Sequence, residues 1–365
     1  MPRKFNISYD SGGTISVCAD TNDIAFYAVT LKEDTADLQA GVYFRVQLCG
    51  ITGHKQFASD SGLLITPSES TALASAILRV FIENGDRSNR KKARLKYLID
   101  DWGTSRFLKE VLKKLAFSLR YVSEGLCKKP IPKIKHGHIG TYKQADGHNY
   151  IGIVVPVGRM TTSTARHITD IAEKFGSGDI RLTTWQNLLI PNISDEQLAD
   201  AQAAIKAVGL AYTSTTISGG LIACTGNTGC KFAAANTKSQ AIILGQYLET
   251  KVKLDQPINI HLTGCHHSCA QHYIGDIGLM GTPVKLESGE KVEGYNIVLG
   301  GGVDDTQAIA REVYKNIPFE KIPPIIETLL KVYQKKRKDG ETFAQYTQRE
   351  KLEDLVAADP IRQAN

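Results

Sequence analysis

The sequence predicts an α/β (α+β) fold in which one module occurs twice, the two copies being related by a pseudo-twofold repeat. Near the start, Asn6–Tyr9 leads to Asp23–Phe26, and near the end Asn259–Leu262 leads to Asp276–Leu279. Asn259 follows Asn6 by 253 positions, and Asp276 follows Asp23 by the same number. The two copies therefore align without a gap. Self-similarity at a fixed spacing is the mark of a repeated structural unit. We therefore expect two copies of one module.

Further features of the two segments continue the repeat. Gly41 and Gly294 keep the same spacing, and each is predicted to open an apolar strand that ends in glycine, at Gly50 and Gly301. Each strand is followed by a pattern of apolar residues typical of an amphipathic helix. These two helices are predicted at Leu73–Ile82 and Ile325–Tyr333.

A third unit is predicted between the two copies. A linker rich in lysine and proline, Lys128–Lys135, precedes alternating strands and helices, an order that indicates a further α/β layer. The predicted elements are a strand at Tyr150–Val157, a helix at Ser163–Phe175, a strand at Ile180–Ile190 and a helix at Asp195–Val208, with Ser194 as its N-cap. We therefore divide the chain into domains at 1–127, 128–212 and 213–365.

Length and composition narrow the class of protein. A chain of 365 residues with 42% hydrophobic and 22% charged residues is typical of a globular protein with more than one domain. No apolar stretch approaches a membrane span and no signal peptide opens the chain, so a cytoplasmic location is expected. The net charge of +6 suits an acidic partner or an anionic substrate, and is weak evidence for nucleic-acid binding.

Four of the seven cysteines form a compact pattern. Cys224 and Cys230 are separated by five residues, Cys265 and Cys269 by three, and 34 residues lie between the pairs. An iron–sulfur cluster needs four thiolates from loops that turn inward, and glycines let the backbone approach it closely. Glycines flank both pairs, at Gly219, Gly220, Gly226, Gly229 and Gly264. The sequence therefore predicts Cys224, Cys230, Cys265 and Cys269 as metal ligands.

Two other interpretations of the cysteines stay open at this point. Any one of them alone could be a buried core residue. A structural zinc site is the stronger alternative, with further ligands available from His266, His267 and His272, although a five-residue spacing is unusual for zinc. The first copy of the repeat offers no matching site, because Gly12 and Ser16 occupy the positions that match Cys265 and Cys269.

The segments around the cysteines resemble a known family. Ala223–Ala233 and Leu262–Gln271, with its continuation Ile274–Gly281, look like the two signature loops of the siroheme-dependent nitrite and sulfite reductases. The resemblance extends over nearly the whole chain. It implies that the four cysteines bind a [4Fe–4S] cluster, and that Cys269 also serves as the axial ligand that joins the cluster to the siroheme iron. It further implies a ferredoxin-like half-domain as the middle unit.

Residues near the N-terminus are similar to the family's substrate-binding motif. The resemblance implies that Lys4 holds the anionic substrate and helps to deliver protons, that Asn6 offers a neutral donor, and that Arg3 pairs with a siroheme carboxylate. Without the resemblance, a basic residue near a terminus is more often part of a solvated tail. In the middle unit, Lys143, Arg181 and Gln186 fall in segments that look like those flanking the siroheme, although an alternating strand also places such residues in solvent.

The substrate-binding pair favours nitrite over sulfite. Sulfite reductases of this family usually carry two lysines where this chain has Lys4 and Asn6, which is the form of the nitrite reductases. Sulfite carries more negative charge at neutral pH, so a second cation stabilises it more. The expected reaction is therefore the six-electron reduction of nitrite to ammonia, with sulfite reduction to sulfide as the alternative. His266-His267 replaces the Pro-Asn common at this position of the family.

The sequence contains no flavin or dinucleotide motif and no second ferredoxin-type cysteine loop, so an external electron donor such as ferredoxin is implied. The basic run 87–96 is a possible docking surface for it, although such a run is more often a solvated helix face. Members of the family normally carry another α/β unit ahead of the motif at Lys4. Three interpretations of this difference are an incomplete sequence of a full reductase, a split enzyme whose other part is a separate chain, and a degenerate protein, and the first is favoured. A non-catalytic iron–sulfur protein is the competing function.

Overall fold

The computed structural model describes residues 4–86, 88–89, 92–128 and 130–356. The chain divides into two compact units, and each is described by itself below. Unit 1 comprises Met1–Ile134 with Val303–Asp305, and unit 2 comprises Lys135–Gly302 with Thr306–Asn365. The boundary at Ile134 falls inside the predicted linker. Among the described residues, no helix has the length and apolar character needed to cross a membrane.

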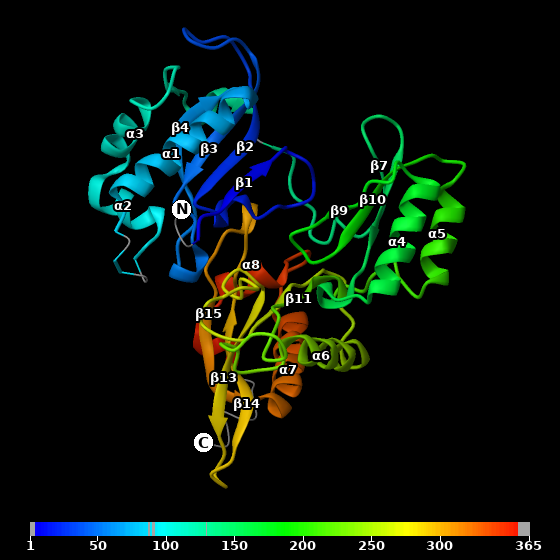
Figure 1. Cartoon of the computed structure of the whole chain (residues 1–365). Coiled ribbons are helices and arrows are strands. Elements are labelled where there is room, and N and C mark those ends of the chain that lie inside the picture. The colour runs from blue at the N-terminus through cyan, green and yellow to red at the C-terminus, as the bar shows by residue number, and fades with distance from the viewer. Residues whose placement is uncertain (1–3, 87, 90–91, 129, 357–365) are drawn as a thin grey trace. The chain divides into compact units, whose positions relative to one another are not determined.

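The sheet of unit 1 has the strand order β1-β2-β3-β4-β5, and a short sixth strand, β6, also pairs with β2. β1 runs parallel to β2, and the remaining pairs are antiparallel. Three helices pack on the sheet and share its apolar core (Figure 1). The strands are β1 (Ile7–Asp10), β2 (Ile24–Leu31), β3 (Gly41–Leu48), β4 (Ser59–Ile65), β5 (Arg120–Tyr121) and β6 (Cys127–Lys128), and the helices are α1 (Ser70–Asn84), α2 (Leu95–Trp102) and α3 (Thr104–Leu112).

The helix α1 shows how local sequence sets an element. Thr66 and Glu69 form a capping box with Pro67 between them, which satisfies backbone N–H groups at the start of the helical segment. The apolar residues of α1 then recur at helical spacing and are buried against the sheet. The predicted helix Leu73–Ile82 is therefore present and is longer at both ends.

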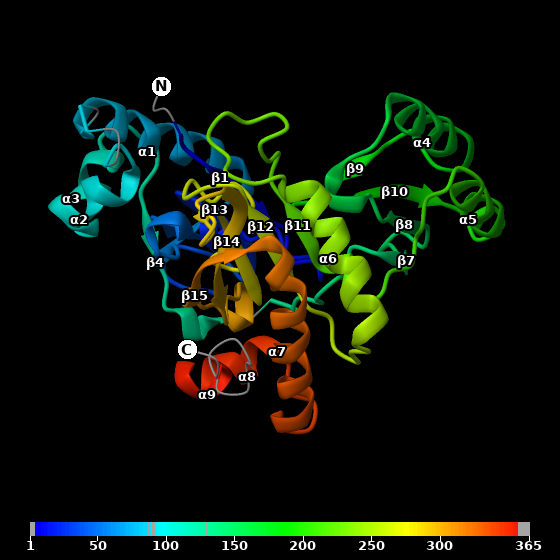
Figure 2. The same cartoon turned by 90° about the horizontal axis from the view of Figure 1, so that it is seen from below.

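The second module, in unit 2, has a sheet with the order β11-β12-β13-β14-β15. β11, β12 and β13 are parallel, and the pairs after them are antiparallel. Figure 2 shows α6 and α7 side by side, and both contribute to the core of this module. The strands are β11 (Leu221–Ala223), β12 (Ile260–Thr263), β13 (Ile277–Lys285), β14 (Lys291–Leu299) and β15 (Arg311–Pro318), and the helices are α6 (Thr237–Lys251), α7 (Ile322–Lys336), α8 (Phe343–Arg349) and α9 (Leu352–Val356).

The register of the strands confirms the repeat. Ile7 of β1 pairs with Ile24 of β2, and 253 positions later Ile260 of β12 pairs with Ile277 of β13, again in parallel. The prediction that Gly294 opens a strand is wrong, because Gly294 lies inside β14 opposite Thr282. The connection from β13 to β14 is a tight turn that is shorter than the connection from β2 to β3. After this turn, the number of positions that separates a residue of the first copy from its match in the second copy is smaller by two.

The middle part of unit 2 forms an antiparallel sheet of order β7-β8-β10-β9, with α4 and α5 packed on it (Figure 1). The elements are β7 (Gly140–Lys143), β8 (Asn149–Ile153), α4 (Thr162–Phe175), β9 (Arg181–Leu182), β10 (Leu188–Ile193) and α5 (Leu198–Ala207). The predicted single strand Ile180–Ile190 is wrong: a turn containing Gln186, at a φ of 59°, divides it into β9 and β10. The predicted strand Tyr150–Val157 ends at Ile153, where a short 3-10 turn with Pro156 follows.

Candidate metal centre

The two cysteine loops begin at the same edge of one parallel sheet. Cys224 directly follows β11, and Cys265 lies two residues beyond the end of β12. These strands are neighbours, with Ala223 opposite Leu262. The Cys224 N–H donates to the Leu262 carbonyl at 3.0 Å and extends the pairing into the first loop. Because parallel strands end at a common edge, two segments far apart in the sequence leave the sheet side by side.

The first loop is closed by its own backbone and by one carboxylate. The Cys230 N–H donates to the Gly226 carbonyl at 2.9 Å, where Gly226 has a φ of +70° that favours glycine. Glu293 of β14 accepts hydrogen bonds from the Asn227 side chain at 2.5 Å and from the Asn236 N–H at 2.8 Å. Glu293 therefore connects Asn227, which lies between the two cysteines of the first pair, to Asn236, which follows them.

The second loop contacts the first directly. The Gly264 N–H donates to the Cys224 sulfur at an N–Sγ distance of 3.1 Å, and the Ala234 N–H donates to the Gly264 carbonyl at 2.7 Å. A Cβ atom on Gly264 would lie 2.5 Å from the Ala233 Cβ, so only glycine permits this approach. A backbone N–H directed at a thiol is one of the contacts by which proteins support iron–sulfur clusters.

The four thiols are electrostatic neighbours. Burial raises the pKa of the Cys265 thiol, a hydrogen bond at His267 opposes this, and the nearby Cys269, Cys224 and Cys230 raise the pKa further. Cys224, Cys230 and Cys265 are partly buried, and Cys269 is exposed. Four thiols from two converging loops, with a backbone donor between the loops, form a donor set that fits a cluster ligated by four cysteines.

No group of three or more His, Cys, Asp or Glu side chains that could hold a metal ion occurs among the described residues. Tetrahedral zinc requires its ligand atoms to converge on a single ion. In a [4Fe–4S] cluster the four thiolates bind four different iron atoms, so the sulfur atoms lie farther apart than the ligands of a single zinc ion.

Two histidines beside the second loop are inside the fold. His261 lies on β12 and its Nδ1 contacts the Ala270 carbonyl at 2.8 Å, while the Nδ1 of His272 contacts the Ser268 hydroxyl at 3.0 Å. Burial lowers the pKa of both imidazoles to about 4, so both are neutral at pH 7. His266 and His267, in contrast, are exposed between the second pair of cysteines.

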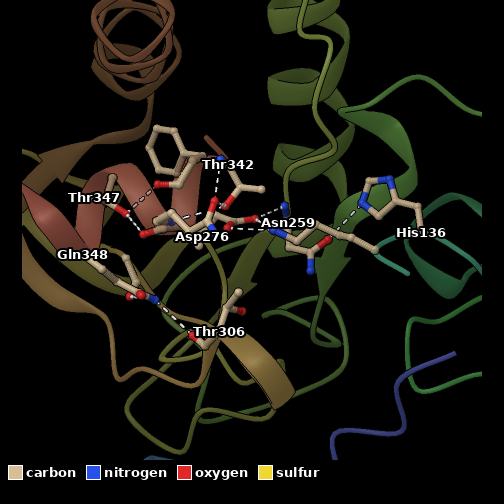
Figure 3. Close-up of polar contacts among 12 residues, drawn as sticks. His136, Asn259, Asp276, Thr306, Thr342, Thr347 and Gln348 are labelled. Carbon is tan, nitrogen blue, oxygen red and sulfur yellow. Dashed lines mark hydrogen bonds and ion pairs between the residues drawn. The ribbon is translucent and has the colours of Figure 1, made fainter. Parts of the chain in front are cut away.

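A polar network fixes the opposite end of β12, where the strand begins. Asp276 accepts the Asn259 N–H at 2.6 Å and pairs with the Lys135 ammonium, and His136 Nε2 contacts Asn259 Oδ1 at 2.9 Å (Figure 3). Asp276 and Asn259 are nearly fully buried. The strand that leads to the second cysteine loop is therefore held at its start by an ion pair between a buried aspartate and a partly buried lysine.

The residues predicted to bind substrate belong to unit 1. Lys4 is exposed and Asn6 is partly buried at the start of β1. The backbone N–H of Asn6 donates to Asp23 at 2.9 Å, and Asp23 in turn pairs with Arg94 at 2.7 Å. This is the counterpart of the network at Asp276. Arg3 lies outside the described residues.

The predicted siroheme-flanking residues differ in their contacts. The Lys143 ammonium pairs with Asp195 at 2.5 Å, and both side chains are exposed. Arg181 is exposed on the edge strand β9. The Gln186 amide is engaged with the backbone of Ala223, donating to its carbonyl at 2.9 Å and accepting its N–H at 3.1 Å. Gln186 therefore contacts the residue that directly precedes Cys224.

Several residues around the first loop carry no motif of their own and were not identified from the sequence. Glu293 lies on a strand more than 50 positions after Asn236, so only the fold brings the two together. Thr237 donates to the Cys224 carbonyl at 2.7 Å, and Lys238 contacts the Ala223 carbonyl at 3.3 Å. Thr237 and Lys238 begin a helix, and only the packing of that helix against β11 brings them to the first cysteine loop.

Comparison with known protein families finds two that match this chain. The family described as "Nitrite and sulphite reductase 4Fe-4S domain" matches residues 1–119 and 219–358. The family described as "Nitrite/Sulfite reductase ferredoxin-like half domain" matches residues 142–208. The two matches alternate along the chain in the same order as the two modules and the middle sheet.

Curated relatives and a solved structure agree with these matches. A ferredoxin–nitrite reductase of Synechococcus elongatus is 35% identical over 335 residues, covering 90% of this chain and 63% of its own length. A ferredoxin sulfite reductase of Mycolicibacterium paratuberculosis is 30% identical over 364 residues, covering 97% of this chain and 63% of its own. The structure of the Mycobacterium tuberculosis NirA protein superposes with a TM-score of 0.83 at 29% identity, covering 93% of this chain and 62% of that one. This chain thus spans just under two thirds of the length of the relatives that it matches.

Proposed function

Because the chain belongs to the nitrite and sulphite reductase family, an oxidoreductase family whose members use siroheme and a [4Fe–4S] cluster, we propose that it serves the six-electron reduction of nitrite to ammonia. Electrons are to come from a ferredoxin, the donor named for the nitrite reductases that it resembles. When bound, the siroheme and the cluster supply the redox chemistry. The protein's own groups bind the anion, deliver protons and hold the cofactors.

The observation that carries the proposal is the convergence of the two cysteine loops. Cys224, Cys230, Cys265 and Cys269 would hold the cluster, and Cys269 would also bind the siroheme iron. The Gly264 N–H at 3.1 Å from the Cys224 sulfur supports the assignment, since hydrogen bonds to the sulfurs stabilise the thiolate form and tune the cluster. The exposure of the Cys269 thiol is compatible with a second bonding partner.

The proposed substrate-binding residues are Lys4 and Asn6. The Lys4 ammonium would hold the nitrite anion and pass protons to it, and the Asn6 side chain would donate a neutral hydrogen bond. Asp23 accepts a hydrogen bond from the backbone N–H of Asn6, and the amide side chain of Asn6 takes no part in this hydrogen bond. Arg3 is proposed to pair with a siroheme carboxylate.

In the middle sheet, Lys143, Arg181 and Gln186 are proposed to lie along the siroheme. Lys143 would exchange its exposed partner Asp195 for a cofactor carboxylate, which costs little because an exposed ion pair contributes only about 0–1 kcal/mol. Arg181 is exposed and accessible to such a group. Gln186 would act mainly through Ala223, because its amide is already engaged there.

A docking surface for the ferredoxin is proposed around the basic run 87–96. Two cations of the run already have acidic partners within the protein: Arg94 pairs with Asp23, and Lys96 with Asp100. Of the other basic residues of the run, Lys92 is described, whereas Arg87, Arg90 and Lys91 lie outside the described residues. A cytoplasmic location is part of the same proposal.

Absorption spectroscopy of the purified chain, reconstituted with iron, sulfide and siroheme, tests the proposal. The expected result is a Soret band together with the broad absorption of an iron–sulfur cluster. Broad absorption without a Soret band would indicate an iron–sulfur protein without siroheme, and bound zinc without iron would indicate a structural site.

An assay of products with reduced methyl viologen as the electron source tests the substrate. Ammonium is expected to form from nitrite faster than sulfide forms from sulfite, because Lys4 and Asn6 present one cation rather than two. The opposite ranking would favour sulfite reductase, the function named for relatives of 30–31% identity.

A further inference from the structure

Lys238 occupies an unfavourable place on its helix. It lies in the first turn of α6, where the helix dipole is positive and no residue of the turn itself is acidic. A cation is unfavourable there, because the partial charge of the helix end is also positive. A carboxylate from another element, Glu293 of β14, accepts the N–H of Asn236, the residue before the helix. The side chain is partly buried, and its ammonium donates to the backbone carbonyls of Val157 and Ala223. Backbone carbonyls stabilise the ammonium but do not neutralise its charge, so a net positive charge is held inside the fold.

This charge is fixed beside the first cluster ligand. Ala223, one of its two acceptors, directly precedes Cys224. The Ala223 carbonyl is shared with the Gln186 amide, which also accepts the Ala223 N–H and so locks this peptide in place. The pKa of Lys238 is lowered by burial, while the Cys224 thiol acts in the opposite direction, as expected for a cation next to a group that becomes an anion. Arg159 is a second cation nearby, and its side chain is exposed.

We propose that Lys238 is the resident counter-charge of the iron–sulfur cluster, stabilising its reduced state, and that Gln186 is the positioning residue that fixes the peptide between them. The inference rests on the proposed function, because it requires a cluster on Cys224. One-electron reduction adds one negative charge to the cluster, and a nearby cation in a partly desolvated site favours that state. The reduction potential of the cluster, and with it the ability to take an electron from the donor, therefore depends on Lys238.

A redox titration of the reconstituted chain tests this inference, with the reduced cluster followed by electron paramagnetic resonance. Lys238→Gln and Lys238→Met remove the charge, and the amide of the former still offers donors to the two carbonyls. Lys238→Arg keeps the charge. Arg159→Met is the matched control, because it removes one positive charge from the same neighbourhood at an exposed position where solvent and salt screen it. Iron and acid-labile sulfide are measured for each variant.

Both neutral variants are expected to shift the potential to more negative values, with Lys238→Arg near the wild type and Arg159→Met shifted less than either. Gln186→Leu keeps the charge but frees Ala223, and is expected to shift the potential in the same direction by a smaller amount. An unchanged potential in fully loaded Lys238→Gln or Lys238→Met would overturn the proposal, as would an equal shift in Arg159→Met.

Loading of the cluster separates the remaining outcomes. If neither neutral variant binds iron and sulfide while Lys238→Arg binds both, Lys238 acts in assembly of the site and the proposal is rejected. A wild-type chain that takes up no cluster would instead reject the proposed function, before any variant is compared.

Discussion

The two modules of this chain have the same strand pairing and different chemistry in one loop. In both, a buried aspartate accepts the N–H of an asparagine where the first strand begins: Asp23 holds Asn6, and Asp276 holds Asn259. Each aspartate also pairs with a cation. The difference lies at the other end of that strand, where Cys265 and Cys269 follow β12 and Gly12 and Ser16 occupy the matching positions after β1.

Carboxylates and ion pairs occupy the neighbourhood of the loop that follows β1. Asp10 ends β1 and pairs with Lys133 at 2.7 Å, and the N–H of Asp304 donates to Asp20 at 3.2 Å. Burial raises the pKa of Asp304 to about 6, with Asp20 adding to the effect. The scaffold is thus maintained by the strand register and by one aspartate in each module. A few side chains in a loop decide whether thiols or acids occupy the edge of the sheet.

The largest effect is expected from removing a proposed ligand. Cys265→Ser should abolish the cluster, seen as a near-complete loss of iron, acid-labile sulfide and visible absorption, because a hydroxyl is a far poorer iron ligand than a thiolate. The matched control is Cys18→Ser in unit 1, where the loop after β1 carries a buried thiol. The control should retain its cluster. An equal loss of iron and sulfide in both variants would contradict the proposal that only the loop after β12 binds the cluster.

The next largest effect is expected from replacing the buried aspartate of each module. Asp23→Ala should lower the free energy of unfolding of unit 1 by about 3–5 kcal/mol, because it leaves the buried Arg94 and the Asn6 N–H without their acceptor. Asp276→Ala should cost unit 2 somewhat less, since Lys135 is 28% exposed and Arg94 only 11%.

The two tryptophans allow each unit to be followed alone in this experiment. Trp102 belongs to unit 1 and Trp185 to unit 2. Urea unfolding monitored by fluorescence in Trp185→Phe and Trp102→Phe backgrounds therefore reports units 1 and 2, respectively. Loss confined to the mutated unit supports the assignment of one aspartate to each module. A loss of less than about 1 kcal/mol from Asp23→Ala would show that the ion pair does not hold unit 1.

Features of this molecule that depend on residues close together in the sequence can be predicted from it, and features that depend on distant contacts cannot. The repeat, the helices at Ser70–Asn84 and Ile322–Lys336 and the family follow from local patterns, because apolar spacing and glycine-rich cysteine loops are written in adjacent residues. The division of Ile180–Ile190 into two strands was missed, since Gln186 adopts a left-handed conformation that its sequence does not signal.

Residues that act through distant partners were also missed. Glu293 reaches Asn227 and Asn236 from another strand, and Lys238 reaches Val157 from a helix more than 80 positions later. Contacts of this kind exist only once the sheets and helices have packed, so a single sequence does not show which charges lie beside the cysteines.

The pH dependence of unit 1 gives a smaller effect. The pKa of Asp304 in the folded protein is about 6, above its ordinary value of 3.8, so folding favours the protonated acid. Its contribution to stability is complete below about pH 4 and is lost as the pH rises through 6. Asp304→Asn keeps a neutral side chain at every pH, so at pH 8 unit 1 of this variant should be more stable than wild type by up to about 3 kcal/mol.

Urea unfolding of wild type and Asp304→Asn in the Trp185→Phe background, at pH 4.5, 6 and 8, measures this difference. The gap between the two proteins should widen from pH 4.5 to pH 8. The groups that face Asp304 are Ser16, Asp20, Lys133 and Asp10. A gap of constant size across this range would show that Asp304 keeps an ordinary acidity and that the carboxylates of this loop are solvated.

The smallest effect on stability is expected at Lys143, which contrasts an exposed ion pair with the buried pairs that hold the modules. Its partner Asp195 is 65% exposed and Lys143 itself 56%, so Lys143→Met should change the free energy of unfolding by less than about 0.5 kcal/mol. If Lys143 meets a siroheme carboxylate, the same variant should bind less siroheme, measured as Soret absorbance per chain at unchanged iron–sulfur content. Asp195→Asn is the matched control, because it breaks the same pair but leaves the lysine free for the cofactor. Equal siroheme content in Lys143→Met and wild type would remove Lys143 from the proposed site.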